Sequence, residues 1–128
     1  MGTVVVDSSA IIALADAADA LHERARELAE RWNGPQIRAL LPATALAEIM
    51  VEPIRRGWAD RMEGLLAESE LEVVPIDAEV ALAAARARAQ RRGLRLPDAL
   101  IIATALVNDA ELVTLDRRMM ALMDHLRG

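Results

Sequence analysis

Four short aliphatic runs, separated by longer segments with helical spacing, restrict the fold of this chain more than any other feature. The runs lie at residues 4–6, 37–41, 71–76 and 111–115. Strands that alternate with helices are usually joined by right-handed crossovers, so they lie parallel in one sheet. The sequence therefore predicts an α/β fold in which helices cover both faces of a parallel sheet.

Residues that start or interrupt helices place the helical segments between these runs. Asp77 is expected to cap one helix, and Pro97 stands in the first turn of another, where proline is tolerated. The triplet "NGP" at 33–35 indicates a turn, and Pro53 and Gly57 are expected to interrupt the chain between two helices. Helices are therefore predicted over 8–15, 21–32, 42–51, 58–68, 77–92, 98–108 and 116–126.

Length and composition limit the class of protein. With 128 residues, of which 54% are apolar, the chain is expected to form a single domain over 1–128 with one core. The absence of cysteine excludes a disulfide framework, cysteine-ligated zinc and a thiol nucleophile. No apolar run reaches the roughly 18 residues that a membrane span requires. No basic segment precedes the first apolar stretch, so we expect a cytoplasmic protein.

Charge and aromatic content bear on nucleic-acid binding. The net charge is −5, and all 15 basic residues are arginine. This acidic balance disfavours nonspecific coating of nucleic acid, which depends on phosphate neutralisation. The chain has two Trp and no Phe or Tyr, so base stacking on an aromatic platform is nearly excluded. An enzyme that acts on nucleic acid through acids gathered in a metal site remains compatible with these numbers.

Three aspartates are predicted to meet at one edge of the sheet. Asp7 follows the first strand, Asp116 follows the fourth, and Asp98 begins the helix that leads to the fourth strand. The carboxyl ends of the strands form the usual binding crevice of open parallel sheets. Each aspartate alone is most simply a helix cap. Carboxylates that converge repel one another, however, and are usually retained to bind a hard cation such as magnesium or manganese.

Glu48 is the candidate for a fourth acid. It lies in the helical segment "PATALAEIMVEP" among apolar neighbours, where a solvated acid would normally have polar ones. Glu52, one turn further on, is the alternative, and it is also placed to pair with Arg55 or Arg56 at the surface. Periodicity alone favours Glu48 only slightly.

The sequence resembles the PIN-domain family at four places. "VVVDSSAIIAL" resembles the opening motif of the family, "PATALAEIM" its second acidic motif, "RLPDALIIATAL" its third and "ELVTLDRRM" its last. The small size is similar to that of the VapC-like ribonuclease toxins of type II toxin–antitoxin pairs. The resemblance implies a three-layer α/β/α fold with a central, mainly parallel sheet of four to five strands, because the family often adds a strand after the last helix.

The resemblance also implies a magnesium- or manganese-dependent endoribonuclease with four carboxylates in its site. Asp7 and Asp98 would bind the principal metal. Glu48 and Asp116 would complete its shell, orient water or hold a second ion. In this reading the resemblance favours Glu48 over Glu52. All four acids are thus candidates both for catalysis and for metal binding.

Residues near the acids are assigned supporting roles. Ser8 and Thr114 are candidates for hydrogen bonds to the metal-binding carboxylates, although a capping or turn role is the simpler interpretation of each. Met119 and Met120 stand where the family commonly has an aromatic residue, and we interpret that position as packing. Candidates for guiding an RNA backbone, with a solvated helix face as the alternative, are Arg88, Arg91, Arg92 and Arg95.

By resemblance, the expected partners are an RNA substrate, a cognate antitoxin protein and a second copy of the chain. Apolar residues of the early helices are expected to contribute to the homodimer and to the groove that takes the C-terminal segment of the antitoxin. These apolar residues are Ile11, Ile12, Leu14 and Leu21. The two histidines, His22 and His125, lack metal-ligand spacing and are expected at the surface.

Two other classes of α/β protein also gather aspartates at strand ends, and each lacks a required residue here. A response-regulator receiver uses a lysine, and this chain has none. A haloacid-dehalogenase-like phosphatase needs a second Asp two residues after the first, where this chain has Ser9. A PIN-fold module that binds a protein partner with little turnover, and a PIN-type nuclease of RNA processing, remain as alternatives.

Overall fold

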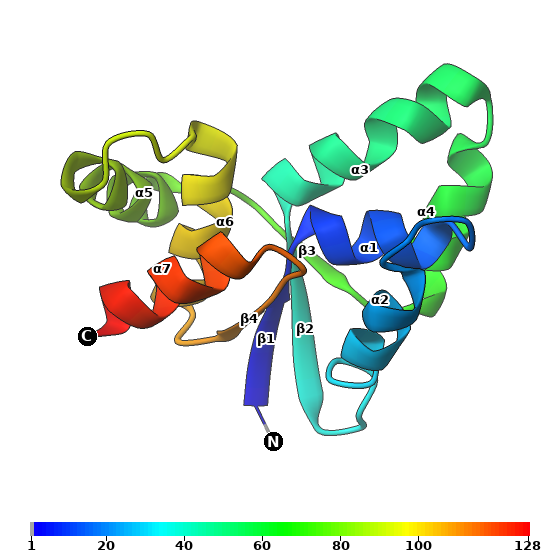
Figure 1. Ribbon diagram of the computed structural model, residues 1–128, viewed down its shortest axis with the longest axis horizontal. Coiled ribbons are helices and arrows are strands. Elements are labelled where there is room, and N and C mark those ends of the chain that lie inside the picture. Colours follow the sequence, from blue (N-terminus) through cyan, green and yellow to red (C-terminus); the bar gives the residue numbers. More distant parts are fainter. Residues whose placement is uncertain (1) are drawn as a thin grey trace.

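A parallel sheet of four strands lies at the centre of the molecule, in a computed structural model that describes residues 2–128 (Figure 1). The strands are β1 (Gly2–Val6), β2 (Ile37–Pro42), β3 (Glu72–Val74) and β4 (Glu111–Val113), and their spatial order is β3-β2-β1-β4. All neighbouring pairs are parallel, and Val5 lies opposite Leu40 on one side and Leu112 on the other. The predicted parallel sheet is confirmed, with four strands.

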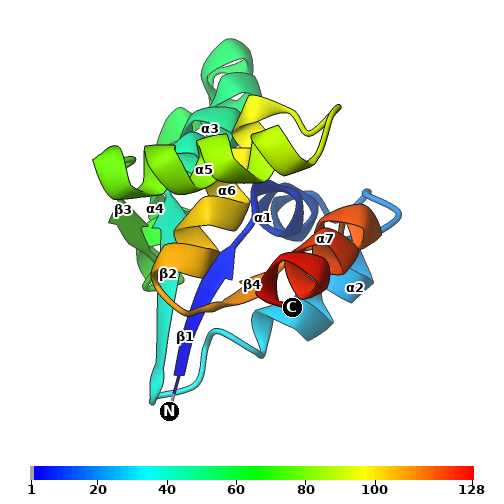
Figure 2. The same ribbon diagram turned by 90° about the vertical axis from the view of Figure 1, so that its left-hand side faces the viewer.

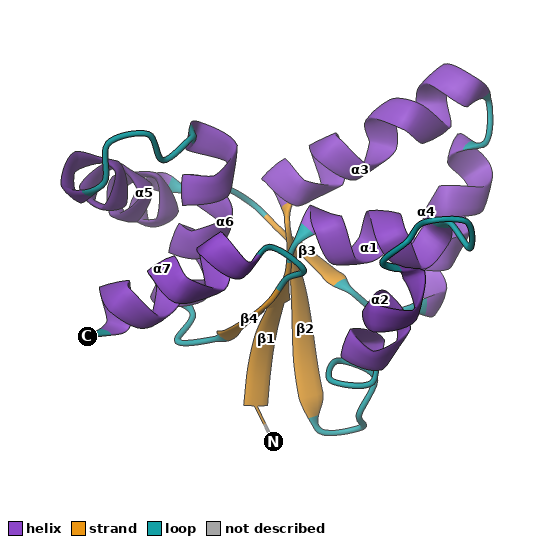
Figure 3. Cartoon of the chain, viewed as in Figure 1, coloured by secondary structure: helices purple, strands orange, loops and turns teal. Residues whose placement is uncertain are grey.

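Helices cover both faces of this sheet, which makes the three layers that the sequence predicted (Figures 1 and 3). One layer contains the first four helices: α1 (Ser8–Ala15), α2 (His22–Ala29), α3 (Ala43–Arg56) and α4 (Ala59–Glu68). The opposite layer, which faces the viewer in Figure 2, contains α5 (Ala78–Gln90), α6 (Leu96–Val107) and α7 (Arg117–Arg127). Across the described residues, no helix is long and apolar enough to cross a membrane.

The core lies on both faces of the sheet, and α6 contributes a large part of it. Ile101 and Ile102 of α6 are fully buried, as are Val5 and Leu40 of the strands they cover. Thr104, also fully buried, donates its hydroxyl to the carbonyl of Leu100 at 2.7 Å. The one polar side chain of this buried stretch is therefore satisfied inside its own helix.

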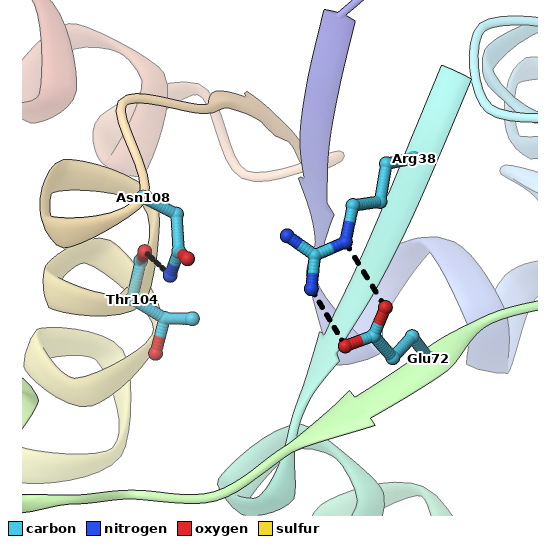
Figure 4. Close-up of polar contacts among 4 residues, drawn as sticks. All are labelled: Arg38, Glu72, Thr104 and Asn108. Atoms are coloured by element: carbon cyan, nitrogen blue, oxygen red, sulfur yellow. Dashed lines mark hydrogen bonds and ion pairs between the residues drawn. The ribbon is translucent and has the colours of Figure 1, made fainter. Parts of the chain in front are cut away.

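Two side-chain contacts stabilise the end of α6 and the edge of the sheet (Figure 4). Asn108, just after α6, donates its side-chain amide to the carbonyl of Thr104 at 2.7 Å and so closes the end of the helix. Arg38 on β2 forms two parallel hydrogen bonds with Glu72 on the edge strand β3, at 3.0 and 2.7 Å. This pairing raises the pKa of Arg38 and lowers the pKa of Glu72. The edge strand is thus joined to its neighbour by side chains as well as by the backbone.

The edges of several elements differ from the prediction for identifiable reasons. The predicted strand at 71–76 ends at Val74, because Pro75 has no N–H group to donate to a neighbouring strand. The predicted strand at 111–115 ends at Val113, because the N–H of Leu115 turns to the hydroxyl of Ser9 instead. The helix predicted over 21–32 is shorter, His22–Ala29.

Helix α3 contains the clearest error of the prediction. It runs through Pro53 and ends only at Arg56, whereas the sequence suggested an interruption at Pro53. Ala45, Ile49 and Pro53 recur every fourth residue, and all three are buried. This continuous buried stripe holds the helix together across the hydrogen bond that the proline removes. No strand follows α7 within residues 2–128, so the sheet has four strands, the lower number of the expected range.

Candidate functional site

The sheet changes its winding direction between β1 and β4, and the first predicted acid lies there. From β1 the chain proceeds through β2 to β3 on one side, and it returns through α5 and α6 to β4 on the other side. Adjacent strands whose crossovers leave in opposite directions open a crevice at their carboxyl ends. Asp7 directly follows β1, and its N–H donates to the carbonyl of Val113 at 2.9 Å, which ties it to the end of β4.

Asp7 is buried, with 4% of its surface exposed, and its carboxylate is held by neighbouring donors. The N–H of Ser8 donates to Oδ1 at 2.8 Å, which makes Asp7 the N-cap of α1. The hydroxyl of Ser9 donates to Oδ2 at 2.9 Å, and the hydroxyl of Thr114 donates to the same oxygen at 2.6 Å. The orientation of this carboxylate is therefore determined by the protein itself.

Thr114 connects two of the predicted acids. Its hydroxyl donates to Asp7 and accepts the N–H of Asp116 at 3.0 Å. Ser9 makes a second connection, because it donates to Asp7 and accepts the N–H of Leu115 at 3.2 Å. The loop after β4 is thus attached to the first acid through two hydroxyl groups.

Glu48 faces this crevice from α3. The hydroxyl of Ser8 donates to its Oε1 at 3.1 Å, across a sequence separation of 40 residues. Burial raises the pKa of the Glu48 carboxyl, and the nearby charges of Asp7 and Asp98 act in the same direction, whereas the Ser8 hydroxyl and Arg95 act to lower it. Glu48 is therefore close enough to both aspartates to be influenced by them.

Asp98 is the third residue of α6 and lies in its first turn. Burial raises the pKa of its carboxyl as well, and the charges of Asp7 and Asp116 act in the same direction. Arg95 and Arg118 act to lower it. The first turn of a helix favours a negative charge, but this carboxyl also meets like charges from two other elements.

Asp116 caps α7. Its Oδ1 accepts the N–H groups of Arg118 at 2.9 Å and Met119 at 3.3 Å. The simple capping interpretation therefore holds for Asp7 and Asp116, whereas Asp98 and Glu48 cap no helix. Met119 is buried, as expected of a packing residue, while Met120 is 42% exposed.

The chemistry of these side chains fits a hard divalent cation. All four acids offer carboxylate oxygens, the ligands that magnesium and manganese prefer, and the chain has no cysteine. Among residues 2–128, no three His, Cys, Asp or Glu side chains are close enough together to hold an ion as they stand. An ion bound at Asp7 together with Glu48 and Asp98 would therefore require these side chains to move closer to one another.

A groove of about 670 Å³ runs beside Asp98 and Asp116, between the α5–α6 loop and α7. Three of the four predicted RNA-binding arginines line it, and Arg118 of α7 joins them from the opposite wall. The fourth, Arg88, instead donates Nε to the carbonyl of Leu94 at 3.1 Å and holds the loop in place. The arginines of the groove are Arg91, Arg92, Arg95 and Arg118.

Several predictions can be compared directly with these contacts. Ser8 and Thr114 do donate hydrogen bonds to the predicted acids. The exposed Glu52 pairs with Arg55 at 3.0 Å and with Arg56 at 3.2 Å, as its alternative interpretation suggested. Sequence reasoning missed Ser9 and Arg118. The sequence feature that could have identified them is their position directly beside the predicted acids, in "DSS" and "DRR".

The early-helix residues proposed for partner contacts fall into two groups. Ile11 is 1% exposed and belongs to the core, so it is not available to a partner, and Leu14 is partly buried against the same core. Ile12 and Leu21 are 43% and 50% exposed. Of the two histidines, His125 is exposed, whereas His22 is half-buried with Nδ1 2.9 Å from the carbonyl of Ala13.

Solved structures with this fold include proteins of toxin–antitoxin systems. A toxin–antitoxin complex from Klebsiella pneumoniae has a TM-score of 0.76 and 24% identity, covering 92% of this chain and 90% of that chain. VapC20 from Mycobacterium tuberculosis, a toxin that cleaves the sarcin–ricin loop, has a TM-score of 0.75 and 21% identity, with 92% and 93% covered. VapBC2 from Rickettsia felis, bound to a promoter DNA fragment, has a TM-score of 0.69 and 16% identity, with 94% and 92% covered.

A search of curated proteins gives no match. The model of the PIN domain family, in contrast, matches residues 4–125, a range that contains all four strands except the start of β1, and all four predicted acids. The order of the motifs along the chain, the parallel sheet and the crevice beside Asp7 agree with that match. The chain belongs to the PIN domain family.

Proposed function

We propose that this chain is a cytoplasmic, magnesium- or manganese-dependent endoribonuclease, in the form of a single nuclease domain over 1–128. The observation that carries the proposal is the set of hydrogen bonds that links three of the acids, because Ser8 donates to both Asp7 and Glu48, and Thr114 donates to Asp7 and accepts from the N–H of Asp116. Asp98 lies near enough for the charges of Asp7 and Asp116 to act to raise the pKa of its carboxyl. Such mutual repulsion is unfavourable in the free protein, and a bound cation removes it.

The four acids have different tasks in this proposal. Asp7, fixed by three donors, provides the rigid ligand. Asp98 and Glu48 approach it from α6 and α3, and Asp116 contributes from the start of α7. A divalent cation held there would act as a Lewis acid on a phosphodiester and promote attack by water. The acids that remain outside its shell would orient that water and accept its proton.

We also propose that the chain is the toxin of a toxin–antitoxin pair and forms a homodimer. The support is the shared fold with the toxin–antitoxin complex from Klebsiella pneumoniae and with VapBC2 from Rickettsia felis. The exposed apolar side chains of Ile12 and Leu21 offer surface for a partner chain. Removal of apolar surface from water is the main driving force of such association.

Cleavage of RNA by the purified protein tests the proposed activity. Cleavage is expected with magnesium or manganese and should stop in excess EDTA. Glu48→Gln should lower the rate at least about 100-fold, the scale on which a positioned electrostatic group contributes. Glu52→Gln is the matched control on the same helix, and it should leave the rate unchanged because Glu52 forms only exposed ion pairs.

Two outcomes would contradict the proposal. Undiminished cleavage in EDTA, in a preparation free of contaminating ribonuclease, would exclude a metal-dependent mechanism. If no RNA is cut under any metal condition while a partner protein is bound tightly, the chain acts as a binding module instead.

A further inference from the structure

The first turn of α1 and the loop after β4 meet at the carboxylate of Asp7. β1 and β4 are neighbouring parallel strands, and the two segments begin where these strands end (Figure 1). Ser9 belongs to the first segment and Thr114 to the second, and their hydroxyl oxygens are 3.3 Å apart although the residues are 105 positions apart in the sequence. Asp7 therefore receives hydrogen bonds from both segments.

The two oxygens of the Asp7 carboxylate have different surroundings. Oδ2 accepts the hydroxyl of Ser9 at 2.9 Å and the hydroxyl of Thr114 at 2.6 Å. Oδ1 accepts the N–H of Ser8 at 2.8 Å, and the Ser8 hydroxyl lies nearer to Glu48, at 3.1 Å, than to Oδ1, at 3.4 Å. A carboxylate oxygen offers about two acceptor positions. Both positions of Oδ2 are thus taken, whereas Oδ1 keeps one for a metal ion.

Both hydroxyl groups are themselves held in place. Ser9 accepts the N–H of Leu115 at 3.2 Å, and Thr114 accepts the N–H of Asp116 at 3.0 Å. A hydroxyl that accepts a backbone N–H directs its own hydrogen elsewhere, here to the carboxylate. Asp7 is 4% exposed, so solvent has little access to these hydrogen bonds. Oδ2 is therefore kept for the protein and not for an ion.

We propose that Ser9 is a positioning residue that determines metal preference: with Thr114 it occupies Oδ2, so that Asp7 binds a divalent ion through Oδ1 alone. The inference rests on the proposed metal-dependent function and specifies how its most rigid ligand acts.

A carboxylate with one available oxygen suits a small ion better than a large one. Magnesium takes a near-octahedral shell, keeps several waters and is commonly held by one or two carboxylates, and manganese accepts the same oxygen ligands. Calcium takes about six to eight oxygens and often uses both oxygens of a carboxylate. Occupation of Oδ2 therefore removes a ligand from calcium and none from magnesium or manganese.

The same arrangement limits the number of ions at Asp7. A carboxylate that bridges two ions needs two free acceptor positions, whether on one oxygen or on both. Asp7 retains one, because Ser8, Ser9 and Thr114 take the others. Asp7 therefore holds one ion, and a bridged pair of ions does not form on it.

Binding of manganese chloride and calcium chloride to the full chain without RNA, measured by calorimetry, tests the proposal. Ser9→Ala removes one of the two hydroxyls from Oδ2. Its affinity for manganese should fall about tenfold, the lower end of the effect of losing support for a metal ligand. Its affinity for calcium should be unchanged, because the freed oxygen offers calcium a second contact. The preference for manganese over calcium should therefore fall about tenfold.

Two further variants separate this role from a structural one. Ser9→Thr keeps the hydroxyl and should retain the wild-type preference. Ser69→Ala is the matched control, because the Ser69 hydroxyl donates to the carbonyl of Leu65 at 2.8 Å, at the end of α4, and contacts none of the four acids. It should change neither affinity.

Electron paramagnetic resonance of the manganese-loaded wild-type protein needs no variant. It should show an isolated manganese ion at Asp7. The signal of a coupled pair of manganese ions that is lost in Asp7→Asn would overturn the proposal.

The results separate this inference from the proposed activity. A lower preference for manganese in Ser9→Ala that Ser9→Thr does not share supports it even if no RNA is cleaved. Equal losses of manganese and calcium affinity in Ser9→Ala overturn it even if the protein is an active metal-dependent ribonuclease. If the wild-type protein binds neither ion, the metal-dependent function is wrong and the role of Ser9 falls with it.

Discussion

Asp7 has its orientation fixed by hydroxyl groups from two different strand ends. Ser9 and Thr114 donate to the same carboxylate oxygen, and Thr114 also receives the N–H of Asp116. Hydrogen bonds of this kind hold a ligand in one geometry and reduce the reorganisation that binding requires. At the scale of single residues, we therefore regard Thr114 as a positioning residue for the proposed metal site.

Thr114→Val tests this role because valine keeps the shape and removes the hydroxyl. Thr114 is 3% exposed, so Asp7 would lose a buried donor, and the N–H of the half-buried Asp116 would lose its partner. We expect a loss of about 1 to 3 kcal/mol in the free energy of unfolding and a fall in cleavage rate of roughly tenfold or more. Urea unfolding and single-turnover kinetics measure the two effects.

Thr114→Ser is the rescue variant, since it restores the hydroxyl and omits only a methyl group. It should recover most of the cleavage rate. If the serine variant is as inactive as the valine variant, the role of Thr114 lies in packing of its methyl group and not in positioning Asp7.

The sequence suggested which acids to compare in the structure, but not which hydroxyl groups hydrogen-bond to them. Ser8 and Ser9 are adjacent and chemically identical, yet Ser8 reaches Glu48 and Ser9 reaches Thr114. Which residue each serine hydroxyl contacts depends on how α1 is rotated about its axis relative to α3 and β4. A local sequence pattern cannot predict that rotation. Arg118 was missed for the same reason, because its contact with the groove depends on the direction in which α7 leaves the sheet.

At the scale of elements, α3 shows why a helix continues through one residue that usually interrupts helices, Pro53, and ends at another, Gly57. Pro53 removes one hydrogen bond but lies on the buried stripe with Ala45 and Ile49, so packing maintains the helix. Gly57 has a φ of 81°, and the N–H of Trp58 reaches back to the carbonyl of Pro53 at 2.9 Å. The helix therefore ends at the glycine, where the left-handed conformation closes it.

A pair of glycine substitutions tests this account. A methyl group at Gly57 would meet no atom within 4 Å, so Gly57→Ala should cost only the left-handed strain of about 1 to 2 kcal/mol. Gly64 lies inside α4, also with open space, and Gly64→Ala should stabilise the protein by about 0.5 to 1 kcal/mol. Thermal melts should thus move in opposite directions. A higher melting temperature for Gly57→Ala would contradict the proposed ending of α3.

At the scale of the whole molecule, alternation of strands and helices was sufficient to predict the parallel sheet, and with it the sheet edge where Asp7 lies. The order β3-β2-β1-β4 places the winding reversal beside β1, and both Asp7 and Asp116 follow strands that flank it. The choice between four and five strands could not be predicted, because a periodic pattern does not tell whether a further strand pairs at the edge of the sheet. The separation of the four carboxylates was also beyond the sequence, since it depends on side-chain rotamers at three helix ends.

The pKa shifts of Glu48 and Asp98 have a consequence for the stability of the metal-free protein. Burial raises both pKa values above those of the unfolded chain, so the folded state binds more protons in the interval between the unfolded and folded values. Stability from these groups is therefore fully present below their ordinary values, about 4, and is lost as pH rises through the raised ones. At neutral pH the metal-free protein carries the whole penalty, and a cation bound at the proposed site would relieve it.

Asp98→Asn should therefore raise the melting temperature of the metal-free protein at pH 7, and this gain should shrink as the pH falls, because more of the wild-type carboxyl is then protonated. In the wild-type protein at pH 7, a cation at 100 times its dissociation constant should add about 2.7 kcal/mol. At roughly 3 to 5 °C per kcal/mol for a chain of this size, that is a shift of about 8 to 13 °C. Asp98→Asn should reduce this shift and abolish cleavage.

Asp77→Asn is the matched control, because Asp77 also lies at the start of a helix but caps α5 outside the crevice, with its carboxylate 3.0 Å from the N–H of Val80. Since asparagine also caps helices well, this variant should keep both the melting temperature and the manganese-induced shift. If Asp98→Asn lowers the melting temperature of the metal-free protein and leaves the metal-induced shift intact, Asp98 supports its helix and not an ion. The proposed metal site would then lose Asp98 as a ligand.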